Sequence, residues 1–313
     1  MHSQCALMHN RIMTHHPEWN DIKVFLAVAR LGTISLAGER LEIEHSTVSR
    51  RIDRLEEKLG VVLFDRRRSG YSLTDAGKAL IPHAESMESA LLAAVEESLG
   101  SAGFIEGTVR VGTPEAFGIN VLTPSLVQLR KKHPGLHIEL MAQPQFPSLV
   151  TREVEILVTL EPPAMGRYKV AKLAKIDYFL FCSPGYLKSH PKIRKLEDIA
   201  QHDLIDYIHD GSVSERYRVL EEVVVKPRRT FTTTSVLAQR AAAAAGLGLI
   251  LLTPYVARAS KDLTCVFPGR PLVTRSLWIA APEDLLKIKR YRYVWDHIRN
   301  LMNQHPDLFH RPS

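Results

Sequence analysis

Cysteine is scarce in this chain of 313 residues, which contains Cys5, Cys182 and Cys265. An odd number of cysteines so far apart excludes the paired framework of a small secreted disulfide protein. Cys182 and Cys265 stand in apolar segments, where a free cysteine is usually a small core residue, and a redox-sensing role is the open alternative. Long apolar runs are missing too, since none reaches the roughly 18 residues that a membrane-spanning helix needs.

The first 17 residues lack the apolar core of a signal peptide. Their histidine-rich composition predicts a disordered N-terminal tail over residues 1–17. His2, Cys5 and His9 offer a metal-binding alternative, but a flexible tail explains them better. We therefore expect a cytoplasmic protein without a membrane partner.

Motifs of enzymes and metal sites are also absent. The sequence contains no Gly-x-Ser-x-Gly elbow, His-Glu-x-x-His pair, phosphate-binding loop or paired-cysteine metal site. Residues 246–248 resemble part of a dinucleotide fingerprint, but the third glycine and the preceding strand are missing, which favours a tight helix-to-strand turn. The sequence therefore predicts no catalytic residue, no metal site and no cofactor.

Positive charge is in excess, and it is concentrated. The net charge is +7, which suits an anionic partner. Residues 50–68 alone contain seven cationic and four anionic side chains, with three consecutive arginines. The length allows two or three compact units, at the usual ~100–200 residues each.

Residues 32–64 have the periodicity of two helices joined by a tight turn. The second helix has apolar residues at i, i+4, i+7 and i+11, which form one buried stripe. The first helix has a similar face, and an earlier helix that Asn20 or Asp21 would cap supplies a third wall. In chain order the three apolar faces are Ile22, Phe25, Leu26 and Ala29; Ile34, Leu36, Ala37 and Leu41; and Val48, Ile52, Leu55 and Leu59.

Two short strands, at 61–64 and 71–73, predict a basic hairpin directly after the second helix. A helix-turn-helix with such a wing inserts its second helix into the DNA major groove, while the wing touches phosphate or the minor groove. A solvated turn is the alternative for an isolated arginine triplet, but the position after the helix pair favours DNA. The predicted DNA-binding residues are His45, Ser46, Thr47, Ser49, Arg50, Arg51, Arg54, Arg66, Arg67 and Arg68.

Several motifs keep the spacing of one bacterial family, among them Phe25-Leu26-Ala27-Val28-Ala29, Thr47-Val48-Ser49-Arg50-Arg51-Ile52 and Leu73-Thr74-Asp75-Ala76-Gly77. On these motifs residues 19–77 resemble the LysR-type transcriptional regulators. The resemblance implies sequence-specific binding to double-stranded promoter DNA in the nucleoid, with RNA polymerase as a possible further partner. Where the family often carries Ser-Gln-Pro, this chain has Glu44, His45 and Ser46, so the operator sequences of relatives do not carry over.

A long helix follows Thr74, and the boundaries expected are 18–76 for the DNA-binding domain and 77–104 for this linker helix and hinge. Pro82 lies inside the helix and should kink or loosen its first turns. A heptad-like stripe predicts packing against a second helix, either of the same chain or of a second copy. The resemblance implies a homodimer or homotetramer. The predicted dimerisation residues are Leu80, Ala84, Met87, Leu91 and Ala94.

From residue 105 the pattern alternates between strands and helices, which predicts a parallel sheet covered by helices. Helices are expected over 115–132, near 148–152 and over 285–304. The pattern resembles the two-lobed α/β fold of periplasmic binding proteins and the LysR effector domain. We expect lobe I to hold residues 105–160 and 269–313, and lobe II residues 161–268. The predicted fold is thus a winged helix-turn-helix, all-α with a small β wing, followed by a long linker helix and a two-lobed effector domain.

Ligands of two-lobed folds bind between the lobes, near strand ends and helix N-termini. Plain helix capping is the alternative role for Thr113 and Ser235, and the two roles can coexist. Hydroxyls, amides and free backbone N–H groups suggest a small carboxylate or an aromatic metabolite as effector. The predicted effector-binding residues are Thr113, Pro114, Glu115, Gln143, Gln145, Phe146, Thr159, Thr234 and Ser235. The alternative function is an enzyme or solute-binding module with an appended DNA-binding domain.

Overall fold

The computed structural model of the chain describes residues 16–68, 70–98, 105–145, 147–164, 166–304 and 309–310. These residues divide into two compact units. The first unit holds the described residues up to 98 together with 150–152, and the second holds the rest. No helix in the described part of the chain is both long and apolar enough to cross a membrane. The predicted N-terminal tail and most of the predicted hinge lie outside the described residues.

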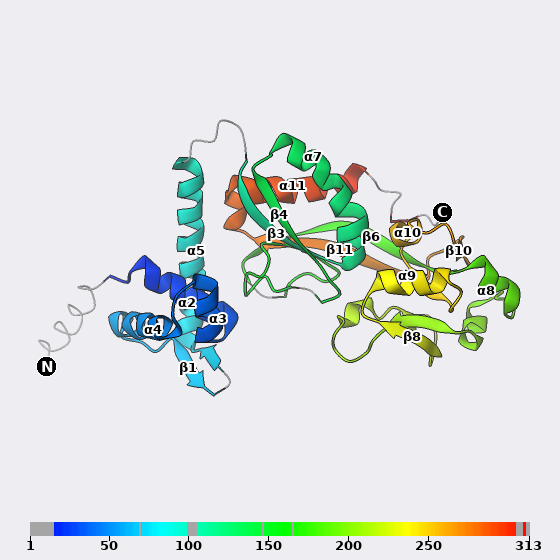
Figure 1. The fold of residues 1–313 in the computed structure, drawn as a ribbon, viewed down its shortest axis with the longest axis horizontal. Helices are drawn as coiled ribbons and strands as arrows, with labels where there is room; N and C mark the ends of the chain where they lie inside the picture. Colours follow the sequence, from blue (N-terminus) through cyan, green and yellow to red (C-terminus); the bar gives the residue numbers. More distant parts are fainter. Residues whose placement is uncertain are drawn as a thin grey trace, which may run out of the picture. The chain divides into compact units, whose positions relative to one another are not determined.

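The first unit is a three-helix core with a small hairpin and a long helix (Figure 1). Buried side chains of the three short helices form its core, among them Phe25, Val48 and Ile52. This agrees with the periodicity of the sequence. Its elements are α2 (Trp19–Leu31), α3 (Ile34–Leu41), α4 (His45–Leu59), β1 (Phe64–Arg67), β2 (Gly70–Leu73) and α5 (Asp75–Ser98).

Two boundaries in this unit differ from the sequence-based expectation. The residue that caps α2 is Glu18, and Asp21 lies buried in the first turn of the helix instead of capping it. The first wing strand begins at Phe64 and not at residue 61, because Glu56 accepts hydrogen bonds from the backbone N–H groups of Leu63 and Phe64. This carboxylate holds the chain in a turn at the position where a strand was expected, so the strand begins later and includes Arg66 and Arg67.

Helix α5 starts as the sequence predicts and continues through Pro82. The hydroxyl of Thr74 accepts a hydrogen bond from the backbone N–H of Gly77 and so caps the helix. Ala84 is fully buried in the core of the first unit, and Leu80 packs against the same core. The early part of the stripe therefore packs within its own chain.

The second unit contains a seven-stranded mixed sheet in which β6 (Tyr168–Cys182) and β11 (Val273–Pro282) pair antiparallel through both lobes. In lobe I, β3 (Gly107–Thr113) pairs in parallel with β4 (Leu136–Ala142) and with β5 (Ile156–Thr159). In lobe II, the second half of β6 pairs with β9 (Ile250–Leu252) and β10 (Thr264–Cys265), and β7 (Leu204–Tyr207) pairs with β8 (Arg229–Thr233). Two long strands are thus the crossovers between lobes, as Figure 1 shows.

Helices cover both lobes. In lobe I they are α6 (Glu115–Phe117), η1 (Gly118–Leu122), α7 (Thr123–Lys132), η5 (Leu285–Lys287) and α11 (Lys289–Gln304). Those of lobe II are α8 (Pro184–Ser189), η2 (Leu196–Gln201), η3 (Glu215–Tyr217), η4 (Leu220–Glu222), α9 (Val236–Ala244) and α10 (Pro254–Ala257). The two-lobed architecture predicted from the sequence is confirmed.

The helix expected over 115–132 is broken by η1, which is a π-helical turn. The backbone N–H and the hydroxyl of Thr123 both donate to the carbonyl oxygen of Gly118, five residues earlier. Pro124 has no N–H to continue a regular helical ladder, which favours this wider turn. The short helix expected near 148–152 is a set of turns, and Arg152 has a left-handed φ of 51° that ends any helical run.

Candidate functional site

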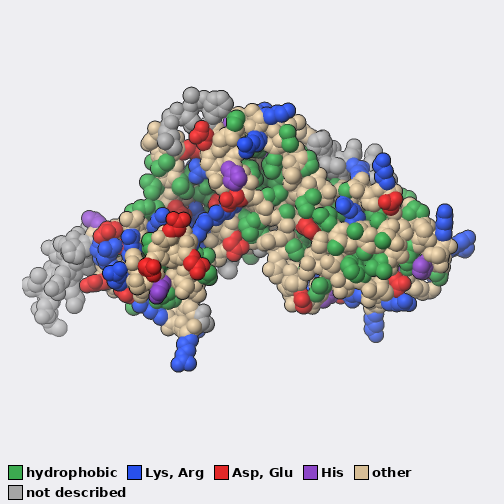
Figure 2. All heavy atoms as spheres, viewed as in Figure 1, with side chains coloured by type: hydrophobic (Ala, Val, Ile, Leu, Met, Phe, Trp, Pro, Cys, Tyr) green, Lys and Arg blue, Asp and Glu red, His purple; other side chains and the backbone are tan. Residues whose placement is uncertain are grey.

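Helix α4 presents a polar face on the side opposite its buried stripe. Val48, Ile52 and Leu55 are fully buried. His45, Ser46 and Arg50 are exposed, whereas Thr47, Ser49 and Arg51 are partly exposed. Figure 2 shows Lys and Arg side chains gathered over α4 and at the tip of the hairpin. The structure therefore brings the helical residues that the sequence singled out onto one accessible surface.

Thr47 and Arg50 lie one turn apart on α4 and interact directly. The guanidinium of Arg50 donates a hydrogen bond of 3.1 Å to the hydroxyl of Thr47. The contact orients a flexible arginine near the start of the helix.

Arg54 has a partner within the chain. Its guanidinium hydrogen-bonds to both carboxylate oxygens of Asp21, whose side chain is fully buried on α2, and it lies 3.4 Å from Glu18. The hydrogen bond to Asp21 raises the pKa of Arg54 above its ordinary value. This bidentate contact ties α4 to α2.

Arg66 is held in the same way. It donates hydrogen bonds of 2.6 Å to Asp53 and 2.7 Å to Glu56, both on α4, and its guanidinium lies over the ring of Tyr71. The hydrogen bond to Asp53 is the largest cause that raises the pKa of Arg66, and the contact with Glu56 adds to it. Both contacts hold the wing against α4. Arg67 and Arg68 are exposed, and within the described part of the chain no ion pair involves them. Strand β1 ends at Arg67 and not at residue 64 as expected, so Arg67 belongs to the strand and not to the turn of the hairpin.

The second half of α5 carries an exposed apolar stripe. Met87, Leu91 and Val95 are 45–48% exposed, and Ala94 is exposed beside them. Val95 was not predicted, although its position four residues after Leu91 places it on the same face of the helix. Exposed apolar side chains at this spacing are typical of a helix that packs against a partner helix.

A cavity lies between the two lobes. Lobe I contributes Pro114, Glu115, Ala116 and Pro144, and most of the remaining wall comes from lobe II. The volume of the cavity is about 40 Å³, which is room for a few water molecules.

Glu115 connects the lobes at the edge of the cavity. One carboxylate oxygen accepts a 2.8 Å hydrogen bond from the hydroxyl of Ser235, and the other accepts a 2.9 Å hydrogen bond from the backbone N–H of Val236. The Ser235 hydroxyl also accepts from the backbone N–H of Ala238, so it caps α9 while it donates to Glu115. The positive end of the α9 dipole thus carries a carboxylate from the opposite lobe.

Four tyrosines from lobe II and the crossover strand line the cavity: Tyr178, Tyr207, Tyr217 and Tyr255. Burial raises the pKa of each phenol, that of Tyr255 to about 12, so all four remain protonated at neutral pH. Gln239 also lines the cavity and is 2% exposed, and its amide nitrogen has no hydrogen-bond partner among the described residues. A buried amide without a partner is available to a ligand.

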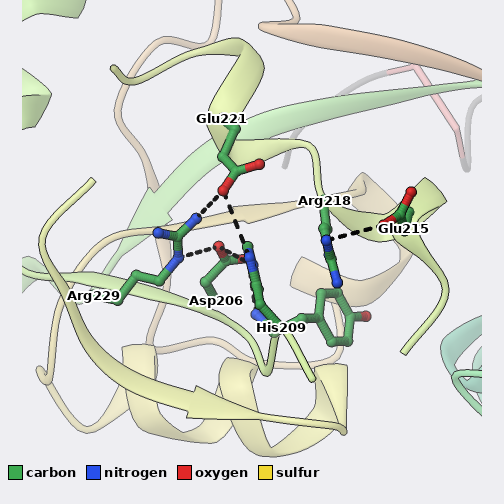
Figure 3. Close-up of polar contacts among 7 residues, drawn as sticks. Asp206, His209, Glu215, Arg218, Glu221 and Arg229 are labelled. Carbon is green, nitrogen blue, oxygen red and sulfur yellow. Dashed lines mark hydrogen bonds and ion pairs between the residues drawn. The ribbon is translucent and has the colours of Figure 1, made fainter. Parts of the chain in front are cut away.

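Asp206, near the end of β7, is among the residues that line the cavity, and its carboxylate is paired with Arg229 (Figure 3). Arg229 donates to it at 2.9 Å and to Glu221 at 2.7 Å. His209 lies 3.3 Å from Asp206 and 3.6 Å from Glu221. Asp206 is therefore part of a network that orders lobe II.

The predicted effector residues divide into groups. Pro114 and Glu115 line the cavity, and Ser235 meets Glu115 at its edge. Gln145 lies off the cavity lining and donates instead to the carbonyl oxygen of Gly211. Thr113, Gln143, Thr159 and Thr234 do not line the cavity either, and Phe146 lies outside the described residues.

Sequence reasoning missed the tyrosines, Asp206 and Gln239. The signal available was a polar residue inside an otherwise apolar segment, as at the ends of β6 and β7. Such a residue is as common in an ordinary core as in a binding site, and only the fold brings these segments together.

Comparisons with known proteins match both units. Residues 19–78 match the family model described as "Bacterial regulatory helix-turn-helix protein, lysR family", and residues 102–303 match "LysR substrate binding domain". The chain is 25% identical to the transcriptional regulator PtxR of Pseudomonas aeruginosa over 299 residues, covering 93% of this chain and 95% of PtxR. It is 34% identical to HdfR of Salmonella newport over 191 residues, covering 58% of this chain and 68% of HdfR.

Solved structures share the fold. A full-length variant of OxyR from Pseudomonas aeruginosa superposes with a TM-score of 0.67 at 18% identity, covering 93% of this chain and 96% of OxyR. LysG of Corynebacterium glutamicum, described with bound effector Arg, gives a TM-score of 0.64 at 18% identity, covering 92% of this chain and 98% of LysG.

Proposed function

Because the chain belongs to the LysR family of bacterial transcriptional regulators, we propose that α4 reads promoter DNA and that the cavity between the lobes receives the effector controlling that binding. The relatives that match are regulators, so the alternative of an enzyme with an appended DNA-binding domain is set aside. The observation that carries the DNA part is the polar, cationic face of α4 opposite its fully buried stripe.

On DNA, we propose a division of roles along this surface. His45, Ser46, Thr47 and Ser49 lie at the start of α4 and contact base edges, as the first turns of recognition helices do. Arg50, Arg51, Arg67 and Arg68 bind bases or phosphates. Arg54 and Arg66, which the sequence assigned to DNA, position the helix and the wing through their ion pairs.

The exposed stripe of α5 supports a homodimer or, by pairing of dimers, a homotetramer. Two copies related by a two-fold axis present two α4 helices, which read a pseudo-palindromic site. A protein bound at such a promoter site acts in the bacterial cytoplasm, at the nucleoid, where it meets RNA polymerase.

The experiment that tests this function is selection of binding sites by the purified full chain from a library of random double-stranded DNA. We expect enrichment of one pseudo-palindromic sequence, protected over both half-sites in a footprint. Recovery of DNA without sequence preference would contradict the proposal. A repeat with Arg50→Ala and Arg51→Ala together should abolish the enrichment, while Lys261→Ala, an exposed cation of lobe II, should leave it unchanged.

A further inference from the structure

Resting on the proposed function, in which the cavity receives an effector, we propose that Glu115 is a built-in anion that holds the lobes closed. The ligand that displaces it is an uncharged, mainly apolar molecule of about one aromatic ring. The sequence suggested a small carboxylate or an aromatic metabolite, on the ground of hydroxyls, amides and free backbone N–H groups in the cleft. The N-terminus of α9 is already occupied by Glu115.

The electrostatics of the cavity disfavour an anionic ligand. The ionisable residues that line it are Glu115, Asp206 and four tyrosines, and no Lys or Arg is among the described residues of its lining. Arg229 neutralises Asp206 and is bound to Glu221 as well. An entering carboxylate would lose its hydration shell and meet Glu115 without gaining a counter-ion.

The other residues that line the cavity indicate which ligand would bind favourably. Aliphatic side chains such as Ile205, Leu220 and Leu251 join the tyrosine rings in an apolar wall. Gln239 adds a buried amide nitrogen that lacks a hydrogen-bond partner among the described residues. A ligand with an aromatic ring and one hydroxyl or amide oxygen satisfies both features, since the ring packs on the wall and the oxygen accepts from Gln239.

Size couples binding to the Glu115 contact. A cavity of about 150 Å³ accommodates a molecule such as benzene, whereas this cavity measures about 40 Å³. A ligand with an aromatic ring therefore enters only when the lobes separate. Separation breaks the two hydrogen bonds from Ser235 and Val236 to Glu115, so the same contact that closes the lobes sets the free energy that the ligand must supply.

The test measures thermal unfolding of the full chain with probes of matched shape: benzyl alcohol and benzamide, which are uncharged, and benzoate, which is an anion. We expect at least one uncharged probe to raise the midpoint of the effector domain in the wild type, while benzoate does not. Glu115→Ala removes the carboxylate and frees the N-terminus of α9, so benzoate should gain roughly tenfold in affinity, the effect of one charge-assisted hydrogen bond. Glu161→Ala, which removes an exposed carboxylate paired with Arg216, is the control and should behave like the wild type.

Stabilisation of the wild type by benzoate alone would overturn the inference, and so would the absence of stabilisation by either uncharged probe. Gln239→Met, an apolar substitution of similar volume, distinguishes a wrong ligand class from a wrong effector cavity. If the uncharged probes stabilise this variant as strongly as the wild type, they bind elsewhere and the effector cavity itself is wrong. If benzoate stabilises the wild type and loses its effect in Gln239→Met, the cavity stands and only the ligand class is wrong.

Discussion

Asp21 and Arg54 show how single residues of the first unit divide between structural and recognition roles. Arg54→Met keeps the stem of the side chain but leaves the carboxylate of Asp21 buried without its cation, so we expect a lower unfolding midpoint than in the wild type. Arg67→Met, at an exposed position without an ion pair among the described residues, should leave the midpoint unchanged. Thermal denaturation followed by circular dichroism makes the comparison. Unchanged stability in Arg54→Met, with a loss of DNA affinity equal to that of Arg67→Met, would assign Arg54 to the DNA.

The two described cysteines are predicted to be chemically inert in the folded protein. Burial raises the pKa of Cys182 to about 12 and that of Cys265 to about 11, so neither forms the reactive thiolate at neutral pH. Alkylation at pH 7.5, read by peptide mass spectrometry, should modify Cys182 and Cys265 only after denaturant is added. Rapid modification of either thiol in the native protein would reopen a redox role.

At the scale of elements, the first half of α5 packs within its own chain, whereas the second half carries the exposed apolar stripe. Leu91→Glu places a charge in the exposed stripe of its second half, where Met87 and Val95 are its neighbours. We expect this variant to be monomeric in light scattering and to bind the selected operator more weakly. Ala90→Glu adds the same charge at an exposed position about 100° around the helix and is the matched control. A dimer that persists in Leu91→Glu would move the interface away from α5.

The middle of α5 is braced to α2 by Arg30, which donates hydrogen bonds of 3.1 and 2.7 Å to Glu88. Burial alone would raise the pKa of Glu88, but the hydrogen bond and charge of Arg30 outweigh it and lower the pKa. The stabilisation is therefore present above the unfolded-state pKa and is lost as pH falls through the lower folded-state pKa. The stability difference between the wild type and Glu88→Gln should shrink in that acidic range. A difference that stays constant from neutral pH into this range would contradict the brace.

At the scale of the whole molecule, the sequence predicted the fold well where one physical signal dominates. The apolar stripe of α4, the cap at Thr74 and the alternation of strands and helices all produced the observed elements. The structure departs from the expectation where a distant group decides. Glu56 delays the first wing strand, and the core of the first unit takes Ala84 from a stripe that reads as one continuous heptad.

The candidate sites follow the same division. The surface proposed to bind DNA could be predicted because its residues lie on one helix and one hairpin, so spacing alone brings them together. The cavity could not, because Tyr178, Tyr217 and Gln239 come from separate segments that only the tertiary fold assembles. The role of Glu115 also depends on the opposite lobe, since its partners lie 120 and 121 residues away.

The central claim is that the start of α4 reads sequence while the wing supplies attraction that is independent of sequence. The most direct measurement is the affinity of the wild type, Thr47→Ala and Arg67→Ala for the selected operator and for a shuffled duplex, across a salt series. We expect Thr47→Ala to lose roughly 1–3 kcal/mol of discrimination between the two duplexes with an unchanged salt slope. Arg67→Ala should weaken both duplexes alike and reduce the slope of log K against log salt by ~0.9. Equal, sequence-independent losses in the two variants would contradict the account.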